Sequence, residues 1–569
     1  MTDTKHQDTY PLRQGFALLV LGVVMVLLLM RGVYLHVVER EFLQGQGDAR
    51  YLRTLEVDAT RGMITDRHGE PLAISTPVDS VWVNPKELSV DSDELARLAK
   101  VLQVDVKKAL KGRMHREFVY LRRHVDPDHG VRIMGMGIPG VYLQREYKRY
   151  YPTGEVSAHL VGFTNVDDQG QEGMELVYDD WLSSESGAKQ VIRDRLGRVV
   201  EDVKKIRPAS PGQTLSLTID KRLQYLAYRE LKSIIKRHDA LAGSAVLIDS
   251  RSGDVLALVN QPAFNPNNRS ELRGNLYRNR AVTDLIEPGS IMKPFSVVAA
   301  LESGAVKRDV TIDTRPGYLR VGTSTVKDFR DYGVVDLTTL IQKSSNVGAA
   351  KLAQATAPEA YWQLLSELGF GVLPGTGFSG ERAGQLPHYT TWNEAQRVTL
   401  SYGYGLSATP LQLAQAYTAL ANGGEMVRAR FVRQLEALEP ERHRVFSEEV
   451  ARQVRTMMES VTQGGGTGKR GAVPGYRVAA KTGTVRKAGA SGYMEDRYLA
   501  LYAGIAPASD PRLVMVVVVD EPRGDEYYGG AVAAPVFSEV MAGALRLLDV
   551  MPDDVDTRES ELLMAGGFQ

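Results

Sequence analysis

The chain has no cysteine among its 569 residues. This absence excludes disulfide bonds, cysteine nucleophiles and thiolate metal sites. An excess of either charge is also missing, because 69 basic and 69 acidic side chains give a formal net charge of zero. No nucleic-acid partner is therefore indicated. No internal repeat is visible, and a chain of this length is expected to form two or three hydrophobic cores.

The glycine cluster "QGGGTGKR" at residues 463–470 is similar to a phosphate-binding loop but does not match its motif. Such a loop needs glycine at the first of these positions and serine or threonine at the last. The chain has Gln463 and Arg470 there. We therefore predict no nucleotide site, and we expect neither a cofactor nor a metal.

One long apolar run is present near the start of the sequence. Every residue from 15 to 30 is apolar or glycine, and after Arg31 the run resumes as far as Val38. At a rise of 1.5 Å per residue, a helix over this stretch can cross about 30 Å of hydrocarbon. No small-x-small cleavage site follows, which favours an uncleaved transmembrane anchor at 14–38 over a signal peptide or a buried helix.

Positive charge orients this span only weakly, because Lys5 and Arg13 precede it while Arg40 and Arg50 follow it. The expected orientation, with a short cytoplasmic tail at 1–13 and the bulk of the chain outside, rests on the chemistry predicted below. Arg31 is expected either to snorkel to the interface or to contact a partner membrane helix.

The remainder of the chain divides at the turn-rich stretch "RPASPGQ", residues 207–213. Before it, at 39–207, short alternating runs and a helical stretch around 94–110 predict a mixed domain built on extended pieces. After it, a second domain is expected at 208–550. From 551 to 569 the tail is acidic and lacks periodicity, so we expect it to be disordered.

The order of elements in the second domain predicts its fold class. "TLSLTID" (214–220) and the hairpin "GSAVLIDSRSGDVLALVN" (243–260) have strand patterns, and helical patterns dominate from about 290 to 423. Three strand candidates then follow closely: "YRVAAKTGTV", "RYLALYAGIAP" and "RLVMVVVVDEP". This order predicts an α+β fold in which an antiparallel sheet, completed late in the chain, packs against an all-helical part.

Four Ser-x-x-Lys matches occur, starting at Ser186, Ser233, Ser290 and Ser324, so the pattern alone carries little information. Only Ser290 follows Pro-Gly and opens a long apolar helix, "SIMKPFSVVAALESG". On that helix Ser290 and Lys293 share a face, at the positive end of the helix dipole. Keeping Lys293 neutral near pH 7, as a base requires, costs about 4 to 5 kcal/mol. Burial and a second nearby cation can shift the pKa of a lysine that far.

Two further motifs are candidates for the same site. The Ser-x-Asn sequence at 344–346 starts an apolar helix, and the Lys-Thr-Gly-Thr sequence at 481–484 lies on a predicted strand. Singly, each has a plain structural explanation: Ser344 as a helix cap and Lys481 as a surface lysine. In this order and with these flanks, the joint occurrence of the three motifs favours one shared site with covalent chemistry at Ser290 over coincidence.

The three motifs resemble the active site of the penicillin-binding proteins and serine β-lactamases. "RGMITDRHGEPLA", "YYPTGEVSAHLVGFTN" and "GQEGMELVYDDWL" resemble the pedestal motifs of class B penicillin-binding proteins. "EPGSIMKPF", "SYGYGLSATPLQLAQAY" and "YYGGAVAAPVF" resemble their division-specific FtsI type. The resemblance extends from the anchor to about residue 550. It implies a penicillin-binding/serine β-lactamase-like transpeptidase domain on an extended mixed α/β pedestal, the dimerisation-type domain of this family.

The resemblance also implies roles in a D,D-transpeptidase. Ser290 attacks the penultimate D-alanine carbonyl of a donor stem peptide and Lys293 takes its proton. Ser344 relays that proton to the departing D-alanine, Asn346 holds the acyl amide and Lys293, and Lys481 is the second cation.

Substrate binding is expected on the Lys-Thr-Gly strand and beside it. The resemblance implies that Thr482, Gly483 and Thr484 bind the substrate, with both threonines on its carboxylate. The amides of Ser290 and Thr484 form the oxyanion hole, each donor worth about 3 to 4 kcal/mol. Tyr527 and Tyr528 are expected either to wall the cleft or to be core aromatics.

Further implications concern substrate, partners and location. The substrates are peptidoglycan stem peptides, with a meso-diaminopimelate amine as acceptor. The partners are a SEDS-family septal glycosyltransferase and other divisome membrane proteins, contacted through anchor and pedestal. The expected location is the inner membrane at the division septum, with the catalytic domain in the periplasm.

Several rival functions share the catalytic motifs. A β-lactamase normally lacks the anchor and pedestal, a carboxypeptidase passes the acyl group to water, and a penicillin sensor needs several spans or a signalling domain. Bifunctional class A synthases carry glycosyltransferase motifs that residues 39–207 lack, and a silent scaffold would lose catalytic residues. An elongation-specific transpeptidase remains the alternative, although Glu287 of "EPGS" and the "YYGGAV" sequence favour division.

Overall fold

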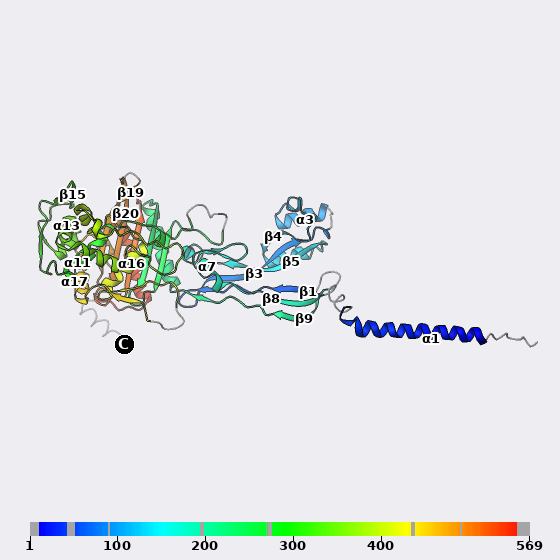
Figure 1. The fold of residues 1–569 in the computed structure, drawn as a ribbon. Helices are drawn as coiled ribbons and strands as arrows, with labels where there is room; N and C mark the ends of the chain where they lie inside the picture. The colour runs from blue at the N-terminus through cyan, green and yellow to red at the C-terminus, as the bar shows by residue number, and fades with distance from the viewer. Residues whose placement is uncertain are drawn as a thin grey trace, which may run out of the picture. The chain divides into compact units, whose positions relative to one another are not determined.

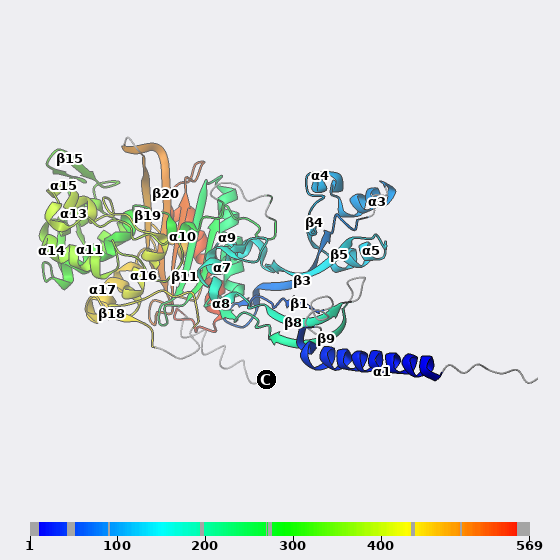
Figure 2. The same ribbon diagram turned by 45° about the vertical axis from the view of Figure 1, so that its right-hand side comes forward.

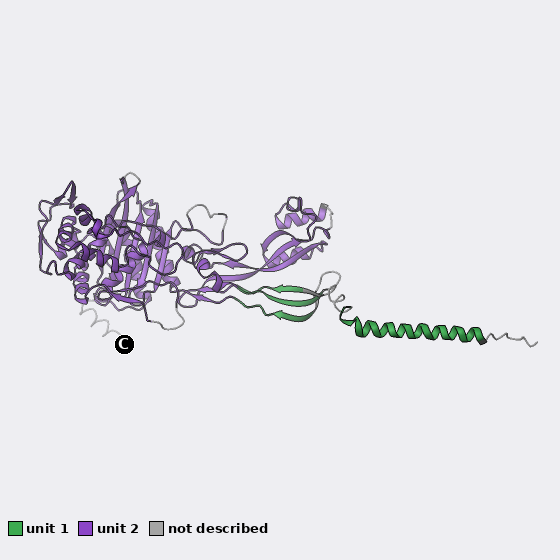
Figure 3. Cartoon of the chain, in the orientation of Figure 1, with its two compact units in different colours: residues 1–60, 184–211 green, residues 61–183, 212–569 purple. Residues whose placement is uncertain are grey.

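The computed structural model describes residues 11–42, 52–88, 92–193, 199–268, 270, 276–433, 439–489 and 492–554. The expected disordered tail therefore lies largely outside the described residues. The chain forms two compact units, shown in Figure 3: unit 1 comprises residues 1–60 and 184–211, and unit 2 comprises residues 61–183 and 212–569.

Unit 1 contains the N-terminal apolar helix that the sequence predicted. Helix α1 (Pro11–Val33) continues into a π-helical turn, η1 (Tyr34–Val38), and none of the 27 residues from Leu12 to Val38 is buried within the described part of the chain. This length and exposure fit a single membrane anchor. The unit also has a three-stranded antiparallel sheet in the order β1 (Leu52–Val57), β8 (Gly187–Arg193), β9 (Val199–Arg207).

The first part of unit 2 is built around the 13-residue strand β3 (Pro71–Val83), which pairs antiparallel with β4 (Val119–Val125) and β5 (Val141–Tyr150). Val81 and Val83 face a core that α3, α4 and α5 complete. The helix predicted over 94–110 is interrupted, because Asp105 accepts a hydrogen bond from the Lys108 amide and starts a new helix. The helices of this part are α3 (Ser92–Leu102), α4 (Val106–Leu110), α5 (Pro127–Met134), η2 (Gly154–Val156), α6 (Ala158–Val161), α7 (Gly173–Val177) and α8 (Asp179–Leu182), with a short pair of strands, β6 (Phe163–Thr164) and β7 (Gly170–Glu172).

A buried group of charges lies among these elements. The Glu175 carboxylate of α7 accepts hydrogen bonds from Arg61 Nε at 2.8 Å and Arg149 Nε at 2.6 Å, and its side chain is fully buried. Arg61 also pairs with Asp179 at 2.7 Å. Because both guanidinium groups are buried as well, the carboxylate of Glu175 is the charge that makes their burial tolerable.

The second part of unit 2 is an antiparallel five-stranded sheet in the order β12-β11-β21-β20-β19. The predicted hairpin became β11 (Ala242–Asp249) and β12 (Val255–Gln261), and the three late strands became β19 (Ala479–Gly489), β20 (Gly492–Ala506) and β21 (Leu513–Asp520). Strand β11 pairs with β21 along its whole length, so the sheet is completed late in the chain, as expected.

Both faces of this sheet are covered by helices, as Figures 1 and 2 show. Ala245 and Leu247 of β11 face α9 (Lys221–Arg237) and α18 (Gly529–Leu547), whereas Val246 and Ile248 face the mainly helical part. Among the described helices, α18 is the only one besides the N-terminal helix that is apolar and long enough to span a membrane. Half of the apolar stretch of α18 is buried in this core, so α18 is a core helix of the domain.

The mainly helical part lies between β12 and β19 in the chain and, among its described residues, also contains three small antiparallel pairs of strands. Its helices are α10 (Arg280–Thr283), η4 (Gly289–Met292), α11 (Lys293–Glu302), α12 (Leu337–Lys343), α13 (Asn346–Ala355), α14 (Pro358–Glu367), η5 (Tyr389–Thr391), α15 (Glu394–Leu400), α16 (Pro410–Ala421), α17 (Glu448–Glu459) and η6 (Lys469–Gly471). In these pairs β13 (Thr311–Asp313) lies beside β16 (Val334–Asp336), β14 (Tyr318–Val321) beside β15 (Ser324–Lys327), and β17 (Glu425–Val427) beside β18 (Arg442–Arg444).

The strand predicted at 214–220 is wrong in extent and in partner. Only β10 (Leu215–Ser216) forms, and it pairs in parallel with β2 (Ile64–Thr65) instead of joining the central sheet. The next amides have other acceptors, since Leu217 donates to the Thr65 carbonyl and Thr218 to the Phe431 carbonyl, each at 2.8 Å. The stretch thus connects the two parts of unit 2.

We expect Glu175→Gln to lower the free energy of unfolding by about 3 to 5 kcal/mol, because two buried guanidinium groups lose their shared counter-charge. Chemical denaturation of the full-length protein in detergent measures the change. The matched control is Glu441→Gln, which breaks the exposed Arg428–Glu441 pair and should change stability little. Equal effects of the two substitutions would contradict this assignment.

Candidate active site

Ser290 lies in the 3₁₀ turn η4, one turn before α11 begins at Lys293. The long helix predicted from Ser290 therefore starts as a 3₁₀ turn, and Pro294 falls in the first α-helical turn, where its missing amide hydrogen is tolerated. Gly289, just before the serine, has φ +58°, and a Cβ atom there would lie 2.2 Å from Val485 Cγ2. Glycine at this position lets β19 lie directly against the turn that carries Ser290.

Lys293 is fully buried and is held by a neighbouring corner of the chain. Its amine donates to the Ser344 carbonyl at 2.5 Å, to Ser344 Oγ at 3.0 Å and to Asn346 Oδ1 at 2.7 Å. Burial lowers the pKa of Lys293 to about 7, against the opposing influence of the Asp328 carboxylate. The geometry thus places a lysine that titrates near neutral pH three residues after Ser290.

Ser344 and Ser345 divide two tasks at the corner between α12 and α13. Ser345 is the helix cap, because its Oγ accepts from the Gly348 amide at 2.9 Å. Ser344 ends α12 in the left-handed region, with φ +59°, which costs a non-glycine residue about 1 to 2 kcal/mol. This strained conformation turns both the carbonyl and the hydroxyl of Ser344 toward Lys293.

Asp328 is a residue of this site that the sequence reasoning missed. It follows β15, and its carboxylate accepts from Ser345 Oγ at 2.6 Å and from the amides of Asn346 and Val347 at 2.5 and 3.0 Å. These bonds hold the start of α13 and so orient Asn346. No sequence pattern marked Asp328; the discarded Ser-x-x-Lys match that ends at Lys327 contributes only its carbonyl, which accepts from Asn346 Nδ2 at 2.9 Å.

Lys481 is the second buried cation of the site. Its side chain is fully buried and donates to the Thr482 carbonyl at 2.9 Å. Burial first, and then the nearby charge of Lys293, lower the pKa of Lys481 well below its usual value. The two lysines are therefore close enough to influence each other, although the motifs that carry them are 188 positions apart in the sequence.

The other predicted binding residues lie along β19 and at the start of α18. A Cβ atom on Gly483 would lie 3.2 Å from Ile291 Cγ2, so the strand lies against η4 here as well. Thr484 Oγ1 accepts from the Gly529 amide at 3.0 Å. Thr482 Oγ1 is 2.8 Å from Thr467 Oγ1, and Thr467 was not predicted.

Tyr527 and Tyr528 form a stacked pair at the surface. Their ring centroids are 4.4 Å apart, and the Tyr527 hydroxyl donates to that of Tyr528 at 3.0 Å. Tyr498 stacks on the other face of Tyr527, with centroids 4.3 Å apart. Because Tyr528 is 50% exposed, the pair is not part of the core.

The Ser290 hydroxyl and the Lys293 amine do not form a hydrogen bond within the described part of the chain. Three donors of a protonated Lys293 are taken by Ser344 and Asn346. A neutral amine has two hydrogens and a free lone pair, so loss of one proton leaves the Lys293 amine able to accept a hydrogen bond.

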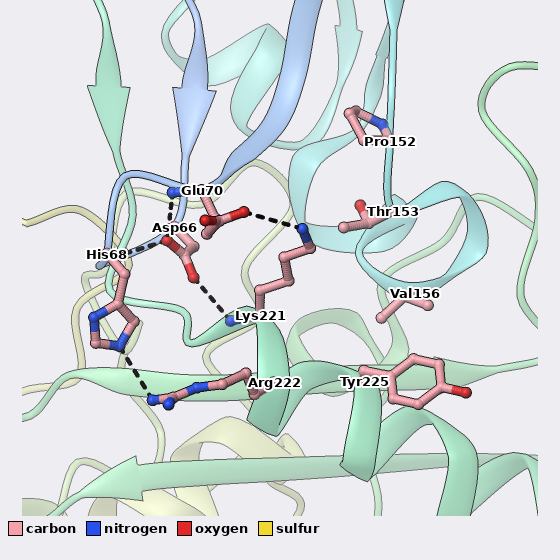
Figure 4. Close-up of a pocket in the computed structure, with 9 residues that line it drawn as sticks. All are labelled: Asp66, His68, Glu70, Pro152, Thr153, Val156, Lys221, Arg222 and Tyr225. Carbon is pink, nitrogen blue, oxygen red and sulfur yellow. Dashed lines mark hydrogen bonds and ion pairs between the residues drawn. The ribbon is translucent and has the colours of Figure 1, made fainter. Parts of the chain in front are cut away.

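A separate cavity of about 660 Å³ lies between residues 66–70, which follow β2, residues 152–156 and the start of α9. Figure 4 shows the side chains that line it. Its central carboxylate, Asp66, accepts from the amides of His68, Glu70 and Lys221 at 2.8 to 3.1 Å. Glu70 in turn pairs with the Lys221 amine at 3.3 Å. None of the predicted site residues lines this cavity.

Two buried lysines, Lys293 and Lys481, lie near the helix turn that carries Ser290, at the edge of an antiparallel sheet. This arrangement fits the class of serine acyltransferases. The family comparisons point to the same class. The family model described as "Penicillin binding protein transpeptidase domain" matches residues 243–542, and "Penicillin-binding Protein dimerisation domain" matches residues 56–217. Peptidoglycan D,D-transpeptidase FtsI of Escherichia coli is 43% identical over 554 residues, covering 95% of this chain and 93% of that protein. The chain belongs to the penicillin-binding proteins of this D,D-transpeptidase family.

Other relatives agree with this membership. Probable peptidoglycan D,D-transpeptidase PenA of Neisseria meningitidis is 41% identical over 546 residues, covering 95% of this chain and 93% of that protein. The transpeptidase domain of Burkholderia pseudomallei penicillin-binding protein 3 matches with a TM-score of 0.55 at 41% identity, over 59% of this chain and 97% of that one. Penicillin-binding protein 3 from Mycobacterium tuberculosis, in a structure complexed with aztreonam, matches with a TM-score of 0.69 at 28% identity. The match covers 88% of this chain and 98% of that one.

Proposed function

We propose that this chain is a serine D,D-transpeptidase that crosslinks the stem peptides of septal peptidoglycan. The observation that carries the proposal is the buried Lys293 amine, which is bonded to Ser344 and Asn346, lies one turn from Ser290 and is within electrostatic reach of Lys481. Membership of the family and the identity to FtsI support the same activity. The division role is favoured over elongation because relatives named FtsI match over nearly the whole chain.

Acylation begins when Ser290 Oγ attacks the carbonyl carbon of the penultimate D-alanine. The hydroxyl proton moves to the neutral Lys293 amine, and the amides of Ser290 and Thr484 stabilise the negative charge on the carbonyl oxygen. The C–N bond then breaks. Ser344, which already bonds Lys293, relays a proton to the nitrogen of the departing D-alanine.

Lys481 contributes through its charge and its position. Because two charged lysines in this buried site repel each other, a proton on Lys481 disfavours a second proton on Lys293 and keeps that base available. Thr482 and Thr484 on the same strand bind the substrate carboxylate, and Asn346 holds the amide of the acyl chain. Tyr527 and Tyr528 wall the cleft near the start of α18, where Tyr528 is half exposed and Tyr527 is partly exposed.

Deacylation transfers the acyl group to an amine of a neighbouring stem, with meso-diaminopimelate as the expected donor of that amine. The nitrogen forms an amide bond to the carbonyl carbon, the bond from carbon to Ser290 Oγ breaks, and the amine proton returns to the serine. One peptide bond is cleaved and one is formed, so the reaction needs no nucleotide and no metal.

The location and partners follow from the same proposal. The N-terminal helix anchors the protein in the inner membrane, with its catalytic domain in the periplasm at the septum. The anchor (14–38) and pedestal (39–207) contact a SEDS-family glycosyltransferase and other divisome membrane proteins, while residues 208–550 form the transpeptidase domain. The two family matches, which end at residue 217 and begin at residue 243, support this division.

A fluorescent penicillin should label the full-length protein covalently, and Ser290→Ala should abolish labelling because the nucleophile is lost. Gel fluorescence measures the label, and thermal unfolding shows that the variant is folded. Ser303→Ala, a helix-end serine outside the cleft, is the matched control and should label normally. Persistent labelling of Ser290→Ala would place the nucleophile elsewhere.

The rate of acylation should rise with pH through a midpoint near 7, because the lowered pKa of Lys293 leaves it protonated and unable to accept a proton below that pH. Well below the midpoint, the second-order rate constant should fall about tenfold per pH unit. Asp328→Asn removes the charge that raises this pKa and should move the midpoint to lower pH. A profile without a midpoint between pH 5.5 and 8.5 would contradict the assignment of Lys293 as the base.

Depletion of the protein in its own host should block septation, so that rod-shaped cells grow into filaments, and a fluorescent fusion should gather at midcell. Time-lapse microscopy measures both. Complementation with the wild-type gene should restore division, whereas Ser290→Ala should not. Round cells in place of filaments would assign the protein to elongation.

A further inference from the structure

The glycine cluster that imitates a phosphate loop lies beside the cleft. Residues 463–467, here called the glycine segment, follow α17 and precede η6, and Gly468 closes the turn by donating to the Val461 carbonyl at 2.9 Å. None of its residues has a role in the acyl transfer described above. Its contacts are made to both of the motifs that flank the nucleophile.

One end of the glycine segment is held by α12, just before the Ser-x-Asn corner. The Lys343 amine donates to the Gly465 carbonyl at 2.8 Å, and Gln342 Nε2 donates to the Gly464 carbonyl at 3.4 Å. Gly465 has φ +81°, and a Cβ atom there would lie only 2.9 Å from Lys343 Nζ. Lys343 directly precedes Ser344, so this bond attaches the glycine segment to the corner that holds Lys293.

The other end is held against the Lys-Thr-Gly strand. Thr467 Oγ1 lies 2.8 Å from Thr482 Oγ1, and the Thr482 side chain is buried by its surroundings. The Thr467 carbonyl lies 2.0 Å from where a Cβ atom on Gly530 would be, so the first turn of α18 packs closely against Thr467. Thr467 therefore contacts both the Lys-Thr-Gly strand and the start of α18.

We propose that the glycine segment is a strut that holds the Ser-x-Asn corner and the Lys-Thr-Gly strand in register across the cleft. The proposal rests on the proposed acyl transfer and adds two positioning residues, Lys343 and Thr467, that touch neither substrate nor nucleophile in this role. Acylation needs Lys293, Ser344, Lys481 and Thr482 placed together within a few tenths of an ångström. A segment that is hydrogen-bonded to both sides fixes the spacing between them. Loss of either bond, the one from Lys343 or the one between Thr467 and Thr482, allows this spacing to vary.

The test is a double-mutant cycle on acylation of the detergent-solubilised full-length protein by a fluorescent penicillin. Lys343→Met removes the ammonium while keeping the length of the side chain, and Thr467→Val removes the hydroxyl while keeping the shape. Each should lower the second-order rate constant about tenfold. The rate constant of the double variant should be no lower than that of each single variant. Loss of one bond already ends the connection between the two sides, so loss of the second bond has no further effect.

Matched variants separate this role from a general loss of structure. Lys343→Arg and Thr467→Ser keep a hydrogen-bond donor at each position, so these variants should keep an acylation rate close to that of the wild-type protein. Lys351→Met removes a lysine that also donates to a backbone carbonyl, that of Asp313, away from the cleft, and Thr456→Val removes a hydroxyl bonded within α17; both should leave the rate unchanged. Thermal unfolding checks each variant, and Lys343→Gln replaces Lys343→Met if the latter does not fold.

Two results would overturn the strut. An unchanged rate in either single variant shows that its bond does not position the cleft. A loss of about 100-fold in the double variant, the product of two tenfold losses, shows that the two residues act independently. Failure of the wild-type protein to be labelled would instead refute the proposed acyl transfer itself, so the two failures are distinguishable.

Discussion

The active site depends on the burial of one amine, that of Lys293. A lysine without solvent loses its hydration, and only hydrogen bonds in fixed positions can replace it. Ser344 and Asn346 supply these bonds, and Asp328 with the Ser345 cap holds them in place. The same burial that demands this support lowers the pKa of Lys293 toward neutrality. The lost hydration of the Lys293 amine and its lowered pKa therefore have one physical cause, the burial of that amine.

The central sheet brings the distant parts of the site together. Because β11 pairs with β21, strands from the two ends of the domain complete one sheet, and the mainly helical part is inserted between them. Strand β19 lies at the edge of that sheet, against the turn of Ser290, where Gly289 leaves room for Val485. The candidate site thus lies where the edge of the sheet meets the inserted helices. A segment that bonds to both sides, as residues 463–467 do, has most effect on their spacing.

Sequence patterns predicted the strands of this sheet well, since their alternation and apolar runs reflect burial on two faces. They were wrong where the pairing partner decided the outcome: residues 214–220 made a two-residue strand with β2, because the following amides bond to Thr65 and Phe431. Asp328 and Thr467 were missed for a related reason. A single aspartate or threonine in a loop carries no local pattern, and each joined the site only through contacts made on folding.

The sequence by itself determined which groups can react and in what order they occur: the serine and lysine one turn apart, the Ser-x-Asn corner, the Lys-Thr-Gly strand and the apolar anchor. These are properties of residue type and short spacing, which local geometry turns into shared helix faces and strands. Only the tertiary structure decided that Lys293 is desolvated, that Ser344 is held in the left-handed region and that Lys481 lies near enough to Lys293 for the charge of Lys293 to lower the pKa of Lys481. Electrostatic interaction and burial depend on distances through space, and no spacing along the chain specifies these.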